Sequence, residues 1–183
     1  PAAVAPASLT KGGAAAATAP RGVPRLVAVD REAVLARPAR VIRGGSGPDV
    51  LHVQVLLDAA GFAPGILDGR WSENTLFALR AFRDAAGIGV ADSVDDAAYE
   101  ALRRAAHDRP ALTKYVVTDA DVRGPYRPVP KGVRAKAAAP CLCYASLLER
   151  LGERFHAQPS LLRALNPEVD FAAVRAGTAL AVP

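Results

Sequence analysis

Six residues between positions 68 and 80 have the types and spacing of a ligand-binding surface. Arginine and asparagine can bind the carboxylates and amides of a peptide through charge-assisted hydrogen bonds. The flat apolar face and N–H of tryptophan suit carbohydrate. The candidate ligand-binding residues are Asp68, Gly69, Arg70, Trp71, Asn74 and Arg80.

Each candidate also has a structural interpretation. An Asp-Gly pair often serves only the geometry of its turn, since glycine tolerates a positive φ and aspartate binds nearby amides. Trp71 precedes a predicted helix and could cover its end. We favour the structural interpretation for Asp68-Gly69 and for Trp71, and for the surface arginines we favour a solvated charge over ligand contact.

The chain offers no set of residues that would make it an enzyme. A hydrolase would need paired carboxylates in a cleft, a metal site or an activated nucleophile. The acids Asp92, Asp95 and Asp96 fall where a helix begins, and there they favour the helix dipole. The three histidines are scattered, so we expect no metal site. We also predict no cofactor and no catalytic residue.

Cys141 and Cys143 lie one residue apart. If residues 141–144 form a strand, both side chains point to the same face, which is a poor arrangement for a mutual disulfide. The spacing also fits neither a zinc site nor a redox pair. The cysteines are therefore predicted to be small core residues.

The charge is unevenly distributed along the 183 residues. The whole chain carries a net charge of +5, yet residues 48–108 contain ten acidic side chains and only five basic ones. Nucleic-acid binding would need a basic stripe on the folded unit itself. The pattern therefore argues against a nucleic-acid partner.

The apolar runs are too short to span a membrane. The chain begins at Pro1 without a methionine, which suggests a processed or trimmed product. A removed signal peptide would explain this, and so would deliberate trimming.

Composition and periodicity divide the chain into five segments. Residues 1–24 are rich in alanine, proline and glycine, which predicts a flexible arm. Residues 25–47 form a short helical lead-in, in which Asp30 could cap a helix that Pro38 ends. The remaining segments are 48–108, 109–139 and 140–183.

Residues 48–108 are predicted to form three short helices. Val53, Leu56, Leu57 and Ala60 recur at helical spacing and line one face of the first helix. Ser72 can cap the second helix, whose inward residues are Thr75, Ala78, Leu79 and Phe82. A third helix follows Asp92-Ser93, with Ala98, Tyr99 and Leu102 facing inward. Helices joined by short connections make a bundle.

Residues 109–139 contain a predicted strand at 115–118 and then an extended linker broken by prolines. Residues 140–183 show a β-α-α-β order: a strand at 141–144, a helix through Leu147 to Phe155, a helix from Pro159, and a closing strand at 178–182. Tyr144 and Phe155 are predicted core residues, and Asn166 is predicted to cap a helix end. The fold class is therefore mainly α, a three-helix bundle plus a small β-α-α-β unit.

Residues 48–108 resemble the peptidoglycan-binding domain family found in many wall hydrolases and transpeptidases. The matching stretches are 53–57, Gly61-Phe62, 64–71, Asn74-Thr75 and 78–82. Ser72, Arg83 and Ser93 depart from the residues usual in the family. The C-terminal unit resembles a degenerate LysM domain, a glycan-binding unit, through Asn166-Pro167, 176–178 and Val182-Pro183.

The whole order, from about residue 26, is similar to the N-terminal region of one branch of exported L,D-transpeptidases. In those enzymes a catalytic domain follows, with a cysteine nucleophile in a Ser-His-Gly-Cys context that this chain does not contain. The resemblance implies a non-catalytic, peptidoglycan-binding region of a cell-envelope enzyme, with a downstream catalytic domain as partner. The alternative is a scaffold that positions or shields that domain without binding glycan.

Overall fold

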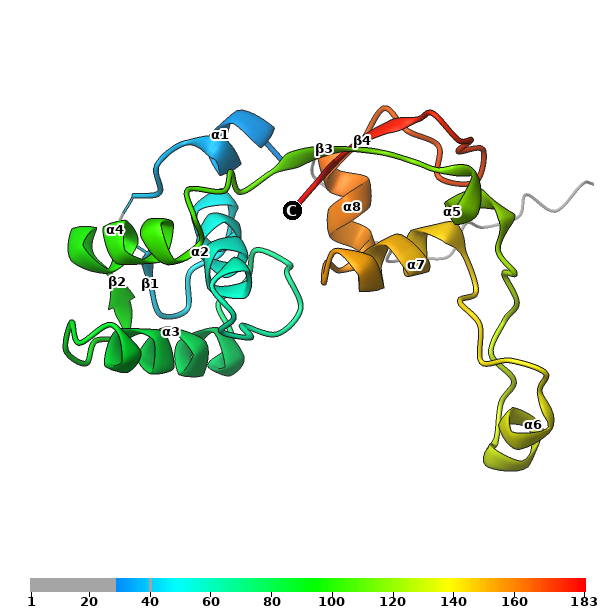
Figure 1. Ribbon diagram of the computed structural model, residues 1–183, viewed down its shortest axis with the longest axis horizontal. Coiled ribbons are helices and arrows are strands. Elements are labelled where there is room, and N and C mark those ends of the chain that lie inside the picture. Colours follow the sequence, from blue (N-terminus) through cyan, green and yellow to red (C-terminus); the bar gives the residue numbers. More distant parts are fainter. Residues whose placement is uncertain (1–28, 40) are drawn as a thin grey trace, which may run out of the picture.

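Helix α2 (Pro48–Ala59) lies in the same group of helices as α1, α3 and α4 in the computed structural model, which describes residues 29–39 and 41–183 (Figure 1). Every residue from Val50 to Leu57 is buried. The reason is that the helix serves two hydrophobic cores, with Leu51 and Val55 in one and Val53, Leu56 and Leu57 in the other. The sequence pattern predicted only the face that carries Val53, Leu56 and Leu57.

The first core lies between α2, α3 (Glu73–Ala85) and α4 (Asp96–Ala105). The Ser72 hydroxyl accepts a hydrogen bond from the Thr75 backbone N–H and caps α3, as predicted. Asp95 caps α4 by accepting from the backbone N–H of Ala98. A two-residue antiparallel pairing of β1 (Val41–Ile42) with β2 (Ser93–Val94) joins the lead-in to this unit.

Arg83, near the end of α3, is a buried cation that organises the loop before α4. Its guanidinium donates to the backbone carbonyls of Gly89 and Ile88 at 2.8 and 3.1 Å, and it pairs with Asp95. A buried charge is tolerated when its hydrogen bonds are satisfied. The Arg83 side chain therefore has a structural role.

The second core is closed by an antiparallel pair, β3 (Thr113–Val116) and β4 (Ala179–Val182), in the register Thr113↔Val182 to Val116↔Ala179. Helices α5 (Asp119–Arg123), α7 (Leu147–Arg154) and α8 (Pro159–Leu165) complete it. The predicted partner strand at 141–144 is wrong, because those residues form no strand and β3 takes that place. The unit thus consists of residues 111–123 and 145–182, interrupted by 124–144.

Asn166 ends α8 and ties it to β4. Its amide donates to the carbonyls of Leu162 and Ala181 and accepts from the Ala181 N–H at 2.7 Å. The side chain is 1% exposed. The predicted helix-ending role is confirmed.

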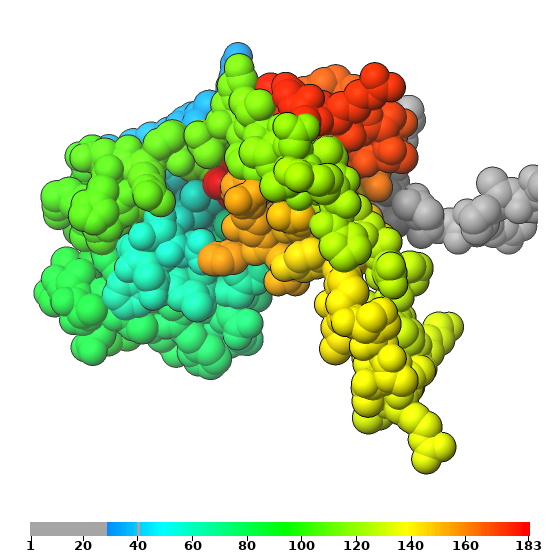
Figure 2. Space-filling view, turned by 45° about the vertical axis from the view of Figure 1, so that its right-hand side comes forward, coloured from blue at the N-terminus to red at the C-terminus, as the bar shows by residue number. Residues whose placement is uncertain are grey.

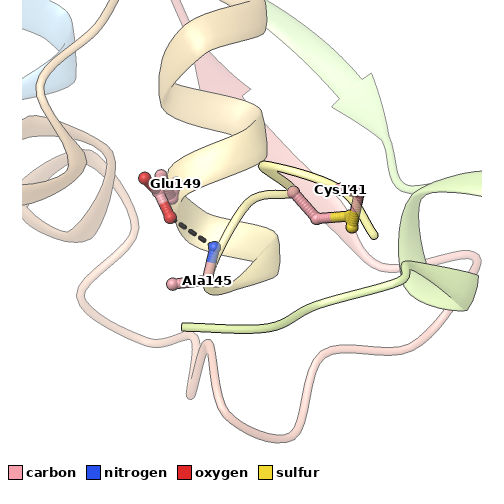
Figure 3. The surroundings of a disulfide bond; sticks show 4 residues. Cys141, Ala145 and Glu149 are labelled. Carbon is pink, nitrogen blue, oxygen red and sulfur yellow. Dashed lines mark hydrogen bonds between the residues drawn. A yellow bond between two sulfur atoms is a disulfide. The ribbon is translucent and has the colours of Figure 1, made fainter. Parts of the chain in front are cut away.

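Cys141 and Cys143 form a disulfide, so their prediction as separate core residues is wrong (Figure 3). The prediction assumed a strand, whereas residues 141–144 are irregular and bring the two Cα atoms to 5.3 Å. Both cysteines are only partly buried. Tyr144 is also no core residue, with 41% of its surface exposed.

The loop before α3 joins the two cores. Leu67, which is 1% exposed, belongs to the second core. Its backbone N–H donates to His156 O at 2.8 Å and its carbonyl accepts from Gln158 N at 3.0 Å. The His156 ring nitrogen lies 3.0 Å from the Asp58 carboxylate on α2. The two units are therefore joined by backbone and side-chain bonds.

The described part of the chain is mainly helical, with eight helices and two small strand pairs. Helix α1 (Arg31–Leu35) is capped by Asp30, as predicted. Helix α6 (Val133–Ala138) lies far from both cores in Figure 1. The predicted arm at 1–24 and residues 25–28 of the lead-in lie outside the described residues.

The buried His52 on α2 should make the stability of the fold sensitive to acid. Its Nδ1 lies 2.7 Å from the Val34 carbonyl. Burial lowers the pKa of His52 below its ordinary value of 6.5, although hydrogen bonds to Val34 and Ala36 partly offset this. Just below pH 6.5, His52 takes up a proton in the unfolded chain but not in the folded chain. The stability that is present above pH 6.5 is therefore lost as the pH falls toward the folded pKa.

We expect the free energy of unfolding to fall between pH 7.5 and 5.5 in the wild type, with a smaller fall in His52→Gln, which keeps a donor for Val34. Urea titrations followed by circular dichroism measure this difference. His107→Gln is the control, because its side chain is exposed. Equal pH dependence in the wild type and His52→Gln would contradict the prediction.

Candidate functional site

The loop that carries most of the candidate residues is held by backbone bonds to residues 45–47 and by the buried side chain of Gln54. This amide lies on α2 and is 1% exposed. Its oxygen accepts from the backbone N–H of Gly69 at 2.8 Å and of Asp68 at 3.3 Å. Its nitrogen donates to the Arg70 carbonyl at 3.0 Å and lies 3.4 Å from the Thr75 hydroxyl. The turn is thus fixed by a buried amide on the neighbouring helix.

Asp68 and Gly69 both have structural roles in this turn. The Asp68 carboxylate accepts from the Arg70 N–H at 2.8 Å. Gly69 has a φ of +71°, and a Cβ there would lie 3.2 Å from the Gly47 carbonyl oxygen. The turn therefore requires glycine both for its backbone conformation and for the close approach of Gly47.

Arg70 projects at the rim of a hollow between the two units, which we call the Arg70 hollow. The hollow has a volume of about 480 Å³. Its polar side chains include one cation and two carboxylates, and its apolar lining includes a leucine from α8. The lining residues used below are Asp30, Pro48, Leu51, Asp68, Arg70 and Leu161. The mixture suits a ligand that has both charged and apolar groups.

Trp71 packs against the first core and is partly buried. Its indole N–H is buried without a hydrogen-bond partner in the part of the chain that the structure describes. This placement agrees with a packing role for Trp71 against the first core.

Asn74 and Arg80 lie away from the Arg70 hollow, since neither lines it. Asn74 is exposed and its side chain lies beside Gly65, where a Cβ would come within 3.1 Å of the amide nitrogen. Arg80 makes a two-pronged ion pair with Asp92, with both hydrogen bonds at 2.8 Å. Of the six candidates, the structure brings together Asp68, Gly69 and Arg70.

Sequence reasoning missed three contributors to this site. Gln54 looked like one polar residue in an apolar helix, and its only signal was its position between buried neighbours. Asp30 and Leu161 reach the hollow from α1 and α8, which lie far from the loop in sequence. No local sequence pattern indicates that these two residues lie beside the 68–70 loop.

The remaining acidic candidates are engaged in structural bonds. Asp92 binds Arg80, Asp95 caps α4 and pairs with Arg83, and Asp96 lies 2.7 Å from Arg37. Residues 29–39 and 41–183 contain no group of three or more histidines, cysteines or acids placed to hold a metal ion. In the same ranges no helix is long and apolar enough to cross a membrane.

Comparison with known proteins gives no family assignment. No protein-family model matches this chain, and no curated protein matches it at a significant level.

Proposed function

We propose that this chain is a non-catalytic peptidoglycan-binding region of a cell-envelope enzyme, with an L,D-transpeptidase as the full-length protein. The observation that carries the proposal is the Arg70 hollow, where a preformed turn presents a cation beside carboxylates and apolar side chains. A peptidoglycan stem contains carboxylates, an amino group and alanine methyls. Each finds a complementary group in the hollow.

Two further features support the proposal. The described residues are mainly helical, and helices α2, α3 and α4 enclose one core, which agrees with the three-helix unit that the resemblance implies. The Cys141–Cys143 disulfide supports an envelope location, because disulfides persist in oxidising compartments. With both cysteines bonded, neither supplies a thiolate nucleophile.

Retention on insoluble peptidoglycan tests the proposal. We expect the wild type to sediment with purified wall material and Arg70→Ala to bind about tenfold more weakly, the effect of losing a charged hydrogen-bond pair. Arg104→Ala is the matched control, because Arg104 is exposed on α4 and does not line the hollow. Failure of the wild type to sediment would overturn the proposal.

A scaffold that positions a catalytic domain is the second candidate function. It is favoured by the bonds that Leu67 makes with His156 and Gln158, since they fix the two units relative to each other. A scaffold predicts no retention on wall material. A wall hydrolase, the least supported alternative, predicts new products in mass spectra after incubation with purified muropeptides, and we expect none.

A further inference from the structure

Residues 124–144 form a projection, which we call the basic arm, and only Tyr126 at its base packs against the second core. The arm leaves the second unit after α5, carries α6 near its tip and returns to α7 (Figure 1). The space-filling view shows it standing out from the body of the protein (Figure 2). Its two limbs meet where the Arg127 N–H donates to the Tyr144 carbonyl at 2.9 Å. No residue of the arm is buried.

The charge of the arm has one sign. It holds four basic side chains and no acidic one: Arg127, Lys131, Arg134 and Lys136. All four are exposed. Across residues 29–39 and 41–183, none of the four forms an ion pair with a carboxylate. The arm thus presents uncompensated positive charge, while residues 48–108 are acidic overall.

The arm also exposes large apolar side chains. Val133 is 86% exposed and Leu142 is 64% exposed. The arm supplies four of the ten large hydrophobic residues that are exposed in the described structure, the others on it being Val129 and Tyr144. Leu142 lies between the two bonded cysteines, so a small covalent ring fixes the backbone that carries it (Figure 3). Exposed apolar side chains on a segment that also carries uncompensated positive charge favour an interaction surface.

We propose that the basic arm docks on a membrane surface that contains anionic lipid. The four cations alone would suit any polyanion, since attraction to phosphate groups needs only charge. The exposed valine and leucine side chains decide between partners, because they gain free energy only where an apolar layer lies beneath the charged headgroups. Repulsion of the acidic 48–108 unit would leave the tip of the arm facing the membrane.

The size of the expected effect follows from the charge. A basic residue near an anionic membrane surface changes the partition coefficient by about fivefold. Four such residues together therefore change it by more than about a hundredfold, and 0.5 M salt should reduce the binding because the charges are screened. This inference does not depend on peptidoglycan binding.

Sedimentation of the full chain with vesicles tests the inference. We expect binding to vesicles of phosphatidylcholine with phosphatidylglycerol and little binding to pure phosphatidylcholine. Replacing the four basic residues of the arm with glutamine should abolish the binding. The matched control removes the same charge from four exposed sites outside the arm: Arg104→Gln, Arg109→Gln, Lys114→Gln and Arg175→Gln. The control should keep most of the binding.

A second variant separates a lipid surface from a soluble polyanion. Val133→Ser with Leu142→Ser keeps every charge and changes only exposed side chains. We expect it to bind the anionic vesicles at least fivefold more weakly than the wild type. The proposal is overturned by absent vesicle binding, by equal losses in the arm and control variants, or by unchanged binding of the Val133→Ser, Leu142→Ser protein. The last result would indicate an arm for anionic polymers.

Discussion

Gln54→Ala is expected to lower the free energy of unfolding by about 3 kcal/mol. The side chain is buried, and its removal strands the Gly69 N–H and the Arg70 carbonyl, whose bonds to it are 2.8 and 3.0 Å. A buried polar group left without a partner costs about 1–3 kcal/mol. Urea unfolding at pH 7, followed by circular dichroism, measures the change.

Gln158→Ala is the control for this substitution. Gln158 precedes α8, is exposed and makes no capping bond with its side chain. It should change stability by less than about 0.5 kcal/mol. A loss below about 1 kcal/mol in Gln54→Ala would mean that the loop is ordered mainly by the bonds of Leu67 to the α7–α8 turn.

Asp121→Ala is expected to cost about 2–3 kcal/mol, because it removes a buried carboxylate that accepts several hydrogen bonds and pairs with the half-exposed Arg154. The Asp121 side chain is 1% exposed and lies 2.9 Å from Arg154. It also accepts from the Thr118 N–H at 2.9 Å and the Thr118 hydroxyl at 2.7 Å, and from the hydroxyl of Tyr115. Its loss would leave these donors without their acceptor. Urea unfolding of the variant measures the cost.

Asp119→Ala is the matched control, since Asp119 is in the same helix but is exposed. Its effect should be within about 0.5 kcal/mol, apart from a small loss of favourable helix-dipole interaction. Equal effects of the two alanine substitutions would contradict a special role for Asp121.

The surroundings of Asp121 should also make the free energy of unfolding depend on pH. Burial alone would raise the pKa of Asp121, but hydrogen bonds from Tyr115 and Thr118 and the charge of Arg154 outweigh burial and hold it below the ordinary 3.8. Below pH 3.8 the unfolded chain therefore binds a proton that the folded chain resists. The stability is present above pH 3.8 and is lost as the pH falls toward the folded pKa.

Asp121→Asn should remove this part of the acid sensitivity. The comparison is between wild type and variant in urea titrations at pH 6, 4 and 3, because Asp95 and Glu168, whose pKa values are also lowered, contribute equally to both. Parallel pH profiles would contradict the prediction.

The sequence predicted the helices well where the pattern is local. Ser72 and Asp30 begin helices as expected, and Thr75, Ala78, Leu79 and Phe82 are buried as expected. The errors are long-range. The alternation at 141–144 resembled a strand. The partner of β4 is instead β3, which precedes the basic arm in the sequence. No local pattern reports which distant strand supplies the hydrogen bonds.

The candidate site was predictable only in its loop. Asp68-Gly69 and Trp71 could be located because turn and cap residues have local signatures. Their support by Gln54 and the arrival of Leu161 depend on how two separate cores meet at α2. Asp121 was also missed, since a carboxylate in a polar stretch gives no sign that it will be buried.

The pairing of β3 with β4 governs the order in which this chain can finish folding. The contacts between α2, α3 and α4 are close in sequence, so they can form while the rest is being made. Leu112 and Val117, by contrast, belong to a core that is complete only once residues 179–182 have been made. Until then the edge of β3 is open to wrong partners. Pairing with β4 therefore closes the open edge of β3.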